Sequence, residues 1–356
     1  MDNKLLNVIE ENAVEAILVT NKYDITYVSK FTGVESYVLI TKSNSYIIVD
    51  KRYIEQAKKQ CIDFNVVLFE NIQFDLMSII KDLLKLNNVK TIGVDIYDIR
   101  HKLYQDIIYT LNDVVIINLE EPFRKIRAIK SPEEIRKIQK AAEIADKSYY
   151  RMLQMISEGM SEKDIEIELE YTIKREGGDG YAFEPIIGAG SKSSMPYSWA
   201  DKNVYLKKGD ILLLNYGVKY DGYTAALARM MSIGNINDKY KNIYKNVFDV
   251  YNKIIESIKP YMKYEELYEI FTESIKDSEY KDYFLKSIGH GRGLQTIESY
   301  TIKPNIKRLI YPNEVYSIGI SISVPDLGGA RLEDAVLIKE DSIVMLTNSV
   351  RNLLNI

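Results

Sequence analysis

The residues that could carry chemistry are concentrated at three places in the second half of the chain. His290 stands in the glycine-bracketed segment Gly289–Gly293, and Glu333 stands in the acidic segment Arg331–Asp334. Imidazole and carboxylate groups serve as general acid–base catalysts and as metal ligands. The third place is residues 209–229, which we expect to form two paired strands.

The pattern of residues 209–229 is that of a buried hairpin. The apolar run Ile211–Leu214 predicts a strand buried on both faces. The dipeptide Asp221-Gly222 predicts a tight turn, so the chain up to Arg229 should pair back antiparallel. Two strands paired in a core can hold side chains at a fixed separation, as a metal site or an acid–base pair requires.

The composition limits the classes of protein to which the chain could belong. The chain has 356 residues, of which 46% are hydrophobic and 28% charged, and its 47 basic and 51 acidic residues give a net charge of −4. This length predicts two domains, and the charge balance argues against nucleic acid or an anionic membrane as a partner. No run of about 18 apolar residues that could span a bilayer occurs. The charges among residues 1–11 predict that this segment is not a secretion signal.

The cysteine content indicates a reducing compartment. Cys61 is the single cysteine, so an intrachain disulfide is excluded and a cytoplasmic location is expected. Neither His101 nor His290 neighbours Cys61 in the sequence, so we interpret it as a structural residue and not as a nucleophile.

The first 118 residues alternate between strand and helix patterns, which predicts an α/β domain built on a mixed sheet. The segment Glu120–Pro122 is the expected linker, so the predicted domains are residues 1–122 and 123–356. Strands are expected at residues 16–20, 37–41, 46–50, 91–95 and 114–117, and helices at residues 4–12, 53–60, 74–86 and 100–112.

The second domain consists of two blocks, each of helices followed by strands, which predicts an α+β architecture of two related halves. Ser131, Pro132 and Glu134 form a strong helix start with a capping box, and residues 161–164 start the next helix, which should run to Arg175. Strands are then expected to residue 233, helices at 238–259 and 264–277, and strands at 285–346.

Taken in order, these segments resemble the pita-bread metallopeptidases (prolidase, aminopeptidase P and methionine aminopeptidase) and their metal-free relative creatinase. The N-terminal domain is similar to the creatinase/prolidase-type domain, which indicates the prolidase/aminopeptidase P branch. The segments that carry the resemblance are Phe31–Gly33, Asp50–Tyr53, Lys130–Ile135, Phe183–Pro196, Lys208–Gly217, Tyr220–Tyr223, Gly289–Leu294 and Arg331–Asp334.

The resemblance implies five ligand positions for two divalent ions such as manganese, cobalt or zinc, and three of them hold other residues here. The two aspartate positions are Asn215 and Ala226, and the first glutamate position is Gly319. His290 and Glu333 are retained. Two ions separated by roughly 3.5–4 Å need bridging carboxylates, which Ala226 and Gly319 cannot supply. We therefore expect no bound metal, although a single ion held by His290, Glu333 and the weak amide of Asn215 is an alternative.

The remaining cleft positions are also altered. Two further family histidines align with Tyr197 and Ile297, and Glu298 is a surviving acidic candidate. We interpret Tyr197 as a pocket-lining aromatic residue. We hypothesise that Arg292 places a positive charge in the former metal cavity and so replaces the ions electrostatically.

The retained residues have structural interpretations that we favour over catalytic ones. For His290 we expect a buried imidazole hydrogen-bonded to Glu333, and for Glu333 a pairing with His290 or Arg331. A raised pKa that would make Glu333 a base is the alternative. Asp221 and Asp334 are expected to serve the turn and a strand edge.

The preferred function is a prolidase/aminopeptidase P-like protein with a degenerate dinuclear site, inactive as a peptidase but able to bind a peptide or small amide. One alternative is an active Xaa-Pro dipeptidase or aminopeptidase with a non-standard metal site. The other is a metal-free creatinase-type amidinohydrolase, which would need a histidine base where this chain has Tyr197. The resemblance further implies a homodimer.

Overall fold

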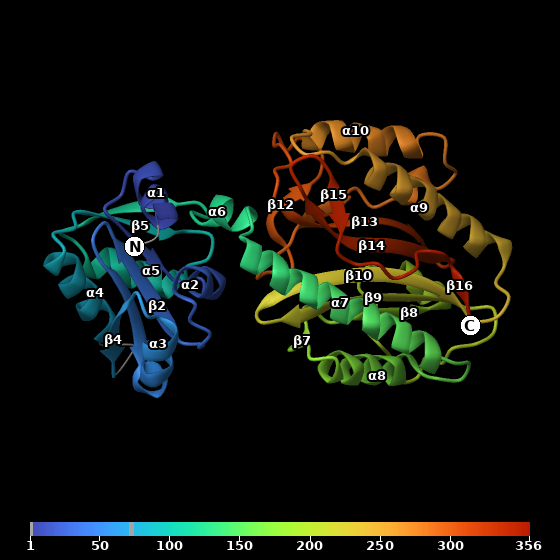
Figure 1. Ribbon diagram of the computed structural model, residues 1–356, viewed down its shortest axis with the longest axis horizontal. Helices are drawn as coiled ribbons and strands as arrows, with labels where there is room; N and C mark the ends of the chain where they lie inside the picture. Colours follow the sequence, from blue (N-terminus) through green and yellow to red (C-terminus); the bar gives the residue numbers. More distant parts are fainter. Residues whose placement is uncertain (1–2, 71–74) are drawn as a thin grey trace. The chain divides into compact units, whose positions relative to one another are not determined.

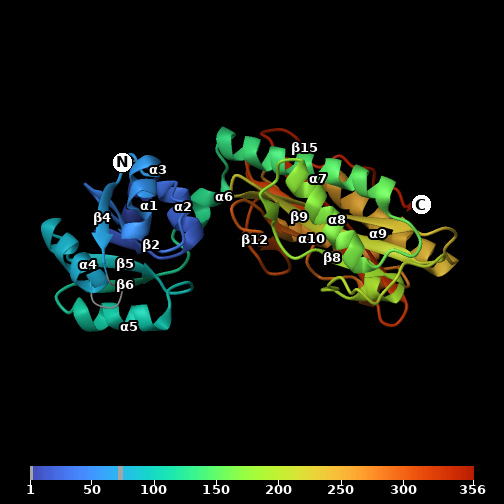
Figure 2. The ribbon, with the colours of Figure 1, turned by 90° about the horizontal axis from the view of Figure 1, so that it is seen from below.

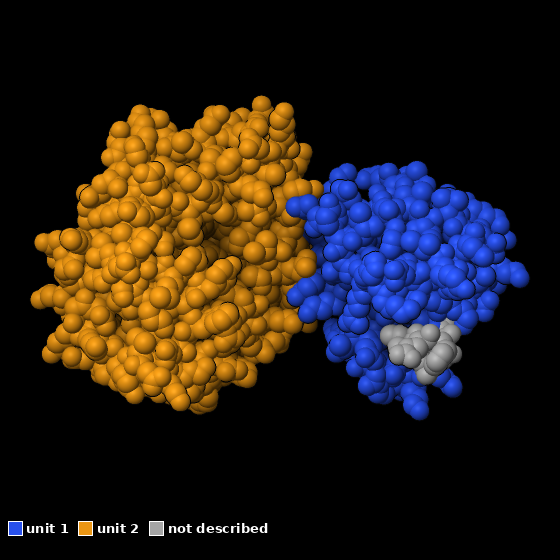
Figure 3. Space-filling model, turned by 180° about the vertical axis from the view of Figure 1, so that it is seen from behind, with its two compact units in different colours: residues 1–127 blue, residues 128–356 orange. Residues whose placement is uncertain are grey.

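The computed structural model describes residues 3–70 and 75–356. The chain divides into two compact units, residues 1–127 and residues 128–356 (Figure 3). The division falls after Arg127, a few residues beyond the expected linker Glu120–Pro122, and Arg127 contacts the first unit. Its Nη1 lies 2.7 Å from Oδ1 of Asp24, and both side chains are buried.

The first unit contains a six-stranded mixed sheet with the strand order β4-β3-β2-β1-β5-β6. This confirms the predicted α/β architecture. The strands are β1 (Ala16–Val19), β2 (Ser36–Thr41), β3 (Ser45–Asp50), β4 (Asn65–Phe69), β5 (Thr91–Asp95) and β6 (Val115–Leu119). The helices are α1 (Asn3–Glu11), α2 (Lys22–Ser29), α3 (Ile54–Gln60), α4 (Asp75–Leu86), α5 (His101–Thr110) and α6 (Arg124–Ala128).

Three of these elements escaped the sequence analysis: α2, β4 and α6. Asn21 caps α2 by accepting hydrogen bonds from the backbone N–H groups of Tyr23 and Asp24, a signal that the sequence did contain. The predicted start of α4 at residue 74 lies outside the described residues. Cys61 is buried, and burial raises the pKa of its thiol, in keeping with a structural role.

The second unit is built on a ten-stranded sheet with the central order β12-β11-β13-β14-β10-β9-β7. Figures 1 and 2 show α7 and α8 packed along the β9–β10 half of this sheet, and α9 and α10 along the β13–β14 half. The helices are α7 (Pro132–Met155), α8 (Glu162–Arg175), α9 (Asp238–Ser257) and α10 (Tyr264–Ile275). The strands are β7 (Gly180–Tyr181), β8 (Ile186–Ala189), β9 (Ile211–Tyr220), β10 (Tyr223–Ser232), β11 (Gly289–Gly291), β12 (Glu298–Ile302), β13 (Val315–Val324), β14 (Gly328–Ile338), β15 (Ile343–Met345) and β16 (Leu354–Asn355).

The local signals of this unit were interpreted correctly. Ser131 and Glu134 form the predicted capping box of α7, and a second capping box starts α8 at Ser161. β9 and β10 form the predicted hairpin, whose turn residue Asp221 has a φ of 46°. The predicted α+β architecture is thus confirmed. Across residues 3–70 and 75–356, no helix is both long and apolar enough to cross a bilayer.

Asp334 is the centre of a buried network and does not lie at a strand edge as predicted. Its Oδ1 accepts hydrogen bonds from Arg229 Nη2 at 2.5 Å and Thr347 Oγ1 at 2.6 Å. Its Oδ2 accepts from Arg351 Nε at 2.9 Å and from the Tyr251 hydroxyl. The prediction was wrong because β14 lies between β13 and β10, and that neighbourhood is set by chain segments far away in the sequence.

Replacing Asp334 with asparagine would leave the guanidinium groups of Arg229 and Arg351 without their anion. We expect Asp334→Asn to lower the free energy of unfolding of the second unit by about 3–5 kcal/mol, because unpaired buried charges are costly. Urea denaturation followed by circular dichroism measures this change. The control Asp249→Asn, at an exposed position of α9, should change the free energy by less than about 0.5 kcal/mol. Equal stability of the two variants would contradict a stabilising role for the network.

Candidate functional site

Strand register places the candidate ligand positions on one face of the ten-stranded sheet. Asn215 lies opposite Ala228, Ala228 lies opposite Glu333, and Glu333 lies opposite Gly319. Residues directly opposite one another project to the same face, and so do residues two apart in one strand, which adds Ala226. We call this the site face. Because adjacent strands are about 4.8 Å apart, the backbones of Asn215 and Glu333 are separated by about 10 Å.

The other face of the sheet is covered by helices. The Tyr216 hydroxyl of β9 donates a hydrogen bond of 2.8 Å to the carbonyl oxygen of Ala145 in α7. Tyr251 of α9 contacts Asp334 of β14. Tyr216 and Asp334 are the immediate neighbours of Asn215 and Glu333, so each points away from the site face. The helices therefore stabilise the sheet without contributing to the site.

A cluster of four side chains, His290, Arg292, Ser317 and Glu333, occupies the site face. β11 pairs with β13 so that His290 lies opposite Ser317. Arg292 donates from Nε to Ser317 Oγ at 2.9 Å and from Nη2 to Glu333 Oε1 at 3.3 Å. Ser317 Oγ donates to the same Oε1 at 2.7 Å. We call these four residues the guanidinium cluster. Arg292 is 1% exposed and points at Glu333, not at solvent.

The hydrogen bonds in this cluster differ from those expected. Glu333 accepts from Arg292 and Ser317, whereas we predicted His290 or Arg331 as its partner. The His290 Nδ1 lies instead 3.2 Å from the carbonyl oxygen of Gly291. The prediction was wrong because Arg292 projects to the same face and brings a permanent charge.

The electrostatics of the cluster fix the charge of each group. Burial lowers the pKa of His290 to about 4, and the nearby charge of Arg292 acts in the same direction, so His290 is neutral at pH 7. Burial acts to raise the pKa of Glu333, but the charges of Arg292 and Arg331 and the hydrogen bond from Ser317 hold it below its ordinary value. Glu333 is therefore ionised, and the alternative of a base with a raised pKa is wrong.

The three positions at which the resemblance implies other ligands contribute no charge to the site face. Asn215 is 2% exposed, and among the described residues its Oδ1 has no hydrogen-bonding partner. Ala226 is fully buried. A Cβ atom built on Gly319 would lie 3.2 Å from both Cβ and Cγ of Glu333. Within residues 3–70 and 75–356, no three His, Cys, Asp or Glu side chains converge closely enough to hold a metal ion.

Glu298 belongs to a separate buried ion pair. Its Oε1 lies 2.7 Å from Lys130 Nζ, and its Oε2 accepts a hydrogen bond of 3.1 Å from the backbone N–H of Gln295. Gly293 leaves room for this carboxylate, since a Cβ there would lie 2.3 Å from Oε1. Glu298 thus connects the segment Gly289–Gly293 to Lys130, the residue before the N-cap of α7. This structural role argues against a catalytic one.

The two positions at which the resemblance implies histidines are open to solvent. Tyr197 is 77% exposed and Ile297 is 63% exposed. Neither the phenol ring of Tyr197 nor the aliphatic chain of Ile297 could transfer protons near neutral pH as an imidazole does. Their exposure leaves both side chains available for contact with a ligand.

Glu162, which the sequence analysis did not single out, fixes the segment that carries Tyr197. Its carboxylate is fully buried and accepts from the backbone N–H groups of Ala189 at 2.9 Å and Asp201 at 3.1 Å. Lys192 Nζ pairs with the same carboxylate at 2.5 Å and with the carbonyl oxygen of Trp199 at 3.3 Å. The indole of Trp199 is 65% exposed. Residues 189–201 are thus tied to one buried anion.

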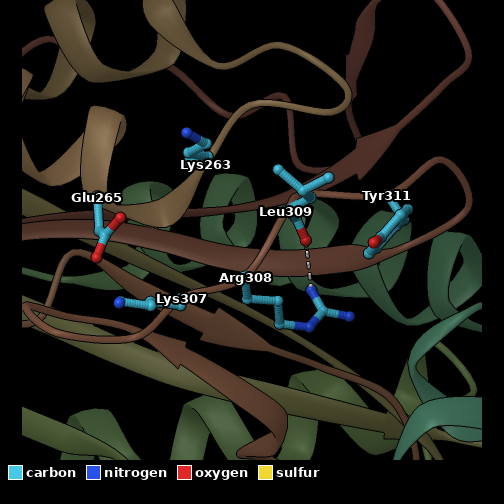
Figure 4. Close-up of a pocket in the computed structure, with 6 residues that line it drawn as sticks. All are labelled: Lys263, Glu265, Lys307, Arg308, Leu309 and Tyr311. Atoms are coloured by element: carbon cyan, nitrogen blue, oxygen red, sulfur yellow. Dashed lines mark hydrogen bonds between the residues drawn. The ribbon is translucent and has the colours of Figure 1, made fainter.

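A cavity of 480 Å³ lies beside the start of α10 (Figure 4). Arg308, which lines it, donates to the Leu309 carbonyl oxygen at 2.9 Å, pairs with Glu314 and donates to the Tyr316 hydroxyl at 3.0 Å. Tyr316 points away from the site face because its neighbour Ser317 points towards it. The cavity contributes nothing to the guanidinium cluster. Its lining consists of Lys263, Glu265, Lys307, Arg308, Leu309 and Tyr311.

The pairing of Arg292 with Glu333 can be tested by a double-mutant cycle. Glu333→Met would leave a buried guanidinium unpaired, and we expect a loss of about 3–5 kcal/mol in the free energy of unfolding. Arg292→Met should cost less, because the Glu333 side chain is 13% exposed and can reach water. The double variant should recover most of the loss, as measured by urea denaturation. Strictly additive losses would contradict a coupled pair.

Comparison with known proteins places the chain in a family. Residues 136–340 match metallopeptidase family M24, and residues 3–129 match the creatinase/prolidase N-terminal domain. The chain is 31% identical over 353 residues to the Xaa-Pro dipeptidase of Pyrococcus furiosus, covering 99% of this chain and 98% of that protein. It is 29% identical over 351 residues to the uncharacterized peptidase YqhT of Bacillus subtilis, covering 99% of this chain and 98% of that protein.

Solved structures agree with these sequence matches. The Xaa-Pro dipeptidase of Bacillus anthracis superimposes with a TM-score of 0.94 at 27% identity, covering 99% of this chain and 98% of that one. The prolidase of Pyrococcus horikoshii superimposes with a TM-score of 0.91 at 28% identity, covering 98% of each chain. The chain therefore belongs to metallopeptidase family M24, with the pita-bread domain and the creatinase-like N-terminal domain of the prolidases.

Proposed function

We propose that this member of the prolidase family binds a peptide or small amide without hydrolysing it at a two-metal centre. One observation carries the proposal. The site face presents the single carboxylate Glu333 to the guanidinium of Arg292, and the other carboxylate positions implied by the resemblance are Asn215, Ala226 and Gly319. The positive charge of Arg292 therefore neutralises the single negative charge of this site.

The donors on the site face do not fit two divalent ions. Hard divalent ions favour charged oxygen ligands, and the neutral amide of Asn215 is a poor replacement. Ala226 and Gly319 offer no ligand atom. A guanidinium and a divalent ion about 5 Å apart would repel each other by about 7 kcal/mol at an effective dielectric constant of about 20. The residues present therefore do not support a reaction step at a metal.

The ligand class is inferred from the family and from what remains accessible. The similar proteins of Pyrococcus furiosus and Bacillus anthracis are named Xaa-Pro dipeptidases, which makes an Xaa-Pro peptide the first ligand to test. His290 is only partly buried and the Glu333 side chain is 13% exposed, so part of each side chain is open to a ligand. Neutral His290 and ionised Glu333 offer hydrogen bonds to the amide and ammonium groups of a peptide.

The first experiment measures metal content and peptidase activity together. We expect the protein, loaded with manganese, cobalt or zinc and then desalted, to retain almost no metal and to leave the dipeptide Gly-Pro uncleaved. Calorimetry with Gly-Pro should still detect binding, and the control Glu333→Gln should weaken it.

Other outcomes would overturn this function in distinct ways. About two ions per chain together with hydrolysis would establish a working peptidase of the usual two-metal kind. One ion per chain with hydrolysis would support a site made by His290, Glu333 and Asn215. Hydrolysis of a guanidino or amide compound that resists chelator and is lost in His290→Ala would support creatinase-type chemistry.

We further propose that the protein is a cytoplasmic homodimer. The proposal rests on the family resemblance, and the single buried Cys61 fits a reducing compartment. Light scattering coupled to gel filtration should give twice the mass of one chain over a tenfold range of concentration. The mass of a single chain throughout that range would rule the dimer out.

A further inference from the structure

Arg292 is enclosed within the protein in a way that hydrogen bonding alone does not explain. Its side chain is 1% exposed, and it bonds to Ser317 and Glu333. Among the described residues, its Nη1 has no hydrogen-bonding partner. A buried donor without a partner is costly, so the position must be maintained by the charge pairing with Glu333.

Gly319 leaves the space in which Glu333 meets this arginine. Gly319 and Glu333 lie directly opposite each other in β13 and β14. Because a Cβ on Gly319 would lie 3.2 Å from two atoms of Glu333, any side chain there would crowd the Glu333 conformation that accepts from Arg292. The absence of a side chain at position 319 therefore leaves room for the Glu333 conformation that pairs with Arg292.

We propose that Arg292 is the resident cation of the site face, and that its guanidinium keeps divalent ions out even when the missing carboxylates are restored. The inference rests on the function proposed above and adds a cause to it. Glu333 Oε1 is already shared by Arg292 and Ser317. A metal ion would have to take this oxygen from a guanidinium that is enclosed and cannot retreat into water.

The test compares restored sites with and without the arginine. The first variant is Asn215→Asp/Ala226→Asp/Gly319→Glu, and the second adds Arg292→Leu. After loading with manganese alone and desalting, we expect the first variant to retain almost no metal. The second should retain one to two ions per chain, with manganese affinity increased at least tenfold over the first.

A control that removes the same charge from another position distinguishes the effect of Arg292 from that of net charge. Arg331→Leu, placed in the first variant instead of Arg292→Leu, removes an equal charge from a residue that is bonded through Nε to Ser321. We expect this control to leave metal retention near zero. If it raises retention as much as Arg292→Leu does, net charge and not the enclosed guanidinium would be responsible, and the proposal would be wrong.

A second pair of variants guards against a folding defect caused by crowding at Gly319. Asn215→Asp/Ala226→Asp is compared with and without Arg292→Leu, and circular dichroism verifies that each protein is folded. Metal retention by both members of a pair, or by neither folded member, would overturn the proposal. Two ions bound by the unaltered protein would instead disprove the proposed function, so the two failures are distinguishable.

Discussion

Two adjacent carboxylates of β14 point to opposite faces of the sheet, and each is neutralised by arginine. Glu333 meets Arg292 on the site face, and Asp334 meets Arg229 and Arg351 beneath the helices. A buried carboxylate is tolerated only when it is paired and hydrogen-bonded. These two pairings therefore require β10, β11, β13 and the C-terminal segment to be in place together, and they connect the site to the stability of the whole unit.

The two faces of the sheet have different roles. On the helix face, Tyr216 and Tyr251 join β9 and β14 to α7 and α9 through buried hydrogen bonds, so their loss would weaken the fold. On the site face, clustered carboxylates would repel one another unless cations neutralised them. Asn215, Ala226 and Gly319 remove that repulsion. On the function we propose, the pita-bread fold would persist without the charges of a dinuclear centre.

Local signals in the sequence predicted the elements well, whereas contacts between distant segments were predicted poorly. The cap at Ser131 and the turn at Asp221 depend on residues within a few positions, and both were interpreted correctly. The placement of Asp334 at a strand edge was wrong because strand order is a property of the whole sheet.

The candidate site was predicted incompletely for the same reason. The resemblance identified which positions to examine, and the strand register then showed that they share a face. The hydrogen bonds of Glu333 were not predicted, although a charge from Arg292 was expected in this region. Arg292, which directly follows β11, and Ser317 of β13 are 41 and 16 residues away from Glu333 in the sequence. Glu162 was missed because a single glutamate in the first turn of a helix carries no sign that three later groups will converge on it.

The segment tied to Glu162 has a practical consequence. Trp199 is the single tryptophan of the chain, and its backbone is held by Lys192 while its indole faces water. An exposed indole emits at longer wavelengths than one shielded from water, and here no second indole would mask the change. Any ligand or subunit that covers this segment should shift the emission to shorter wavelengths, so the protein contains its own fluorescent reporter beside Tyr197.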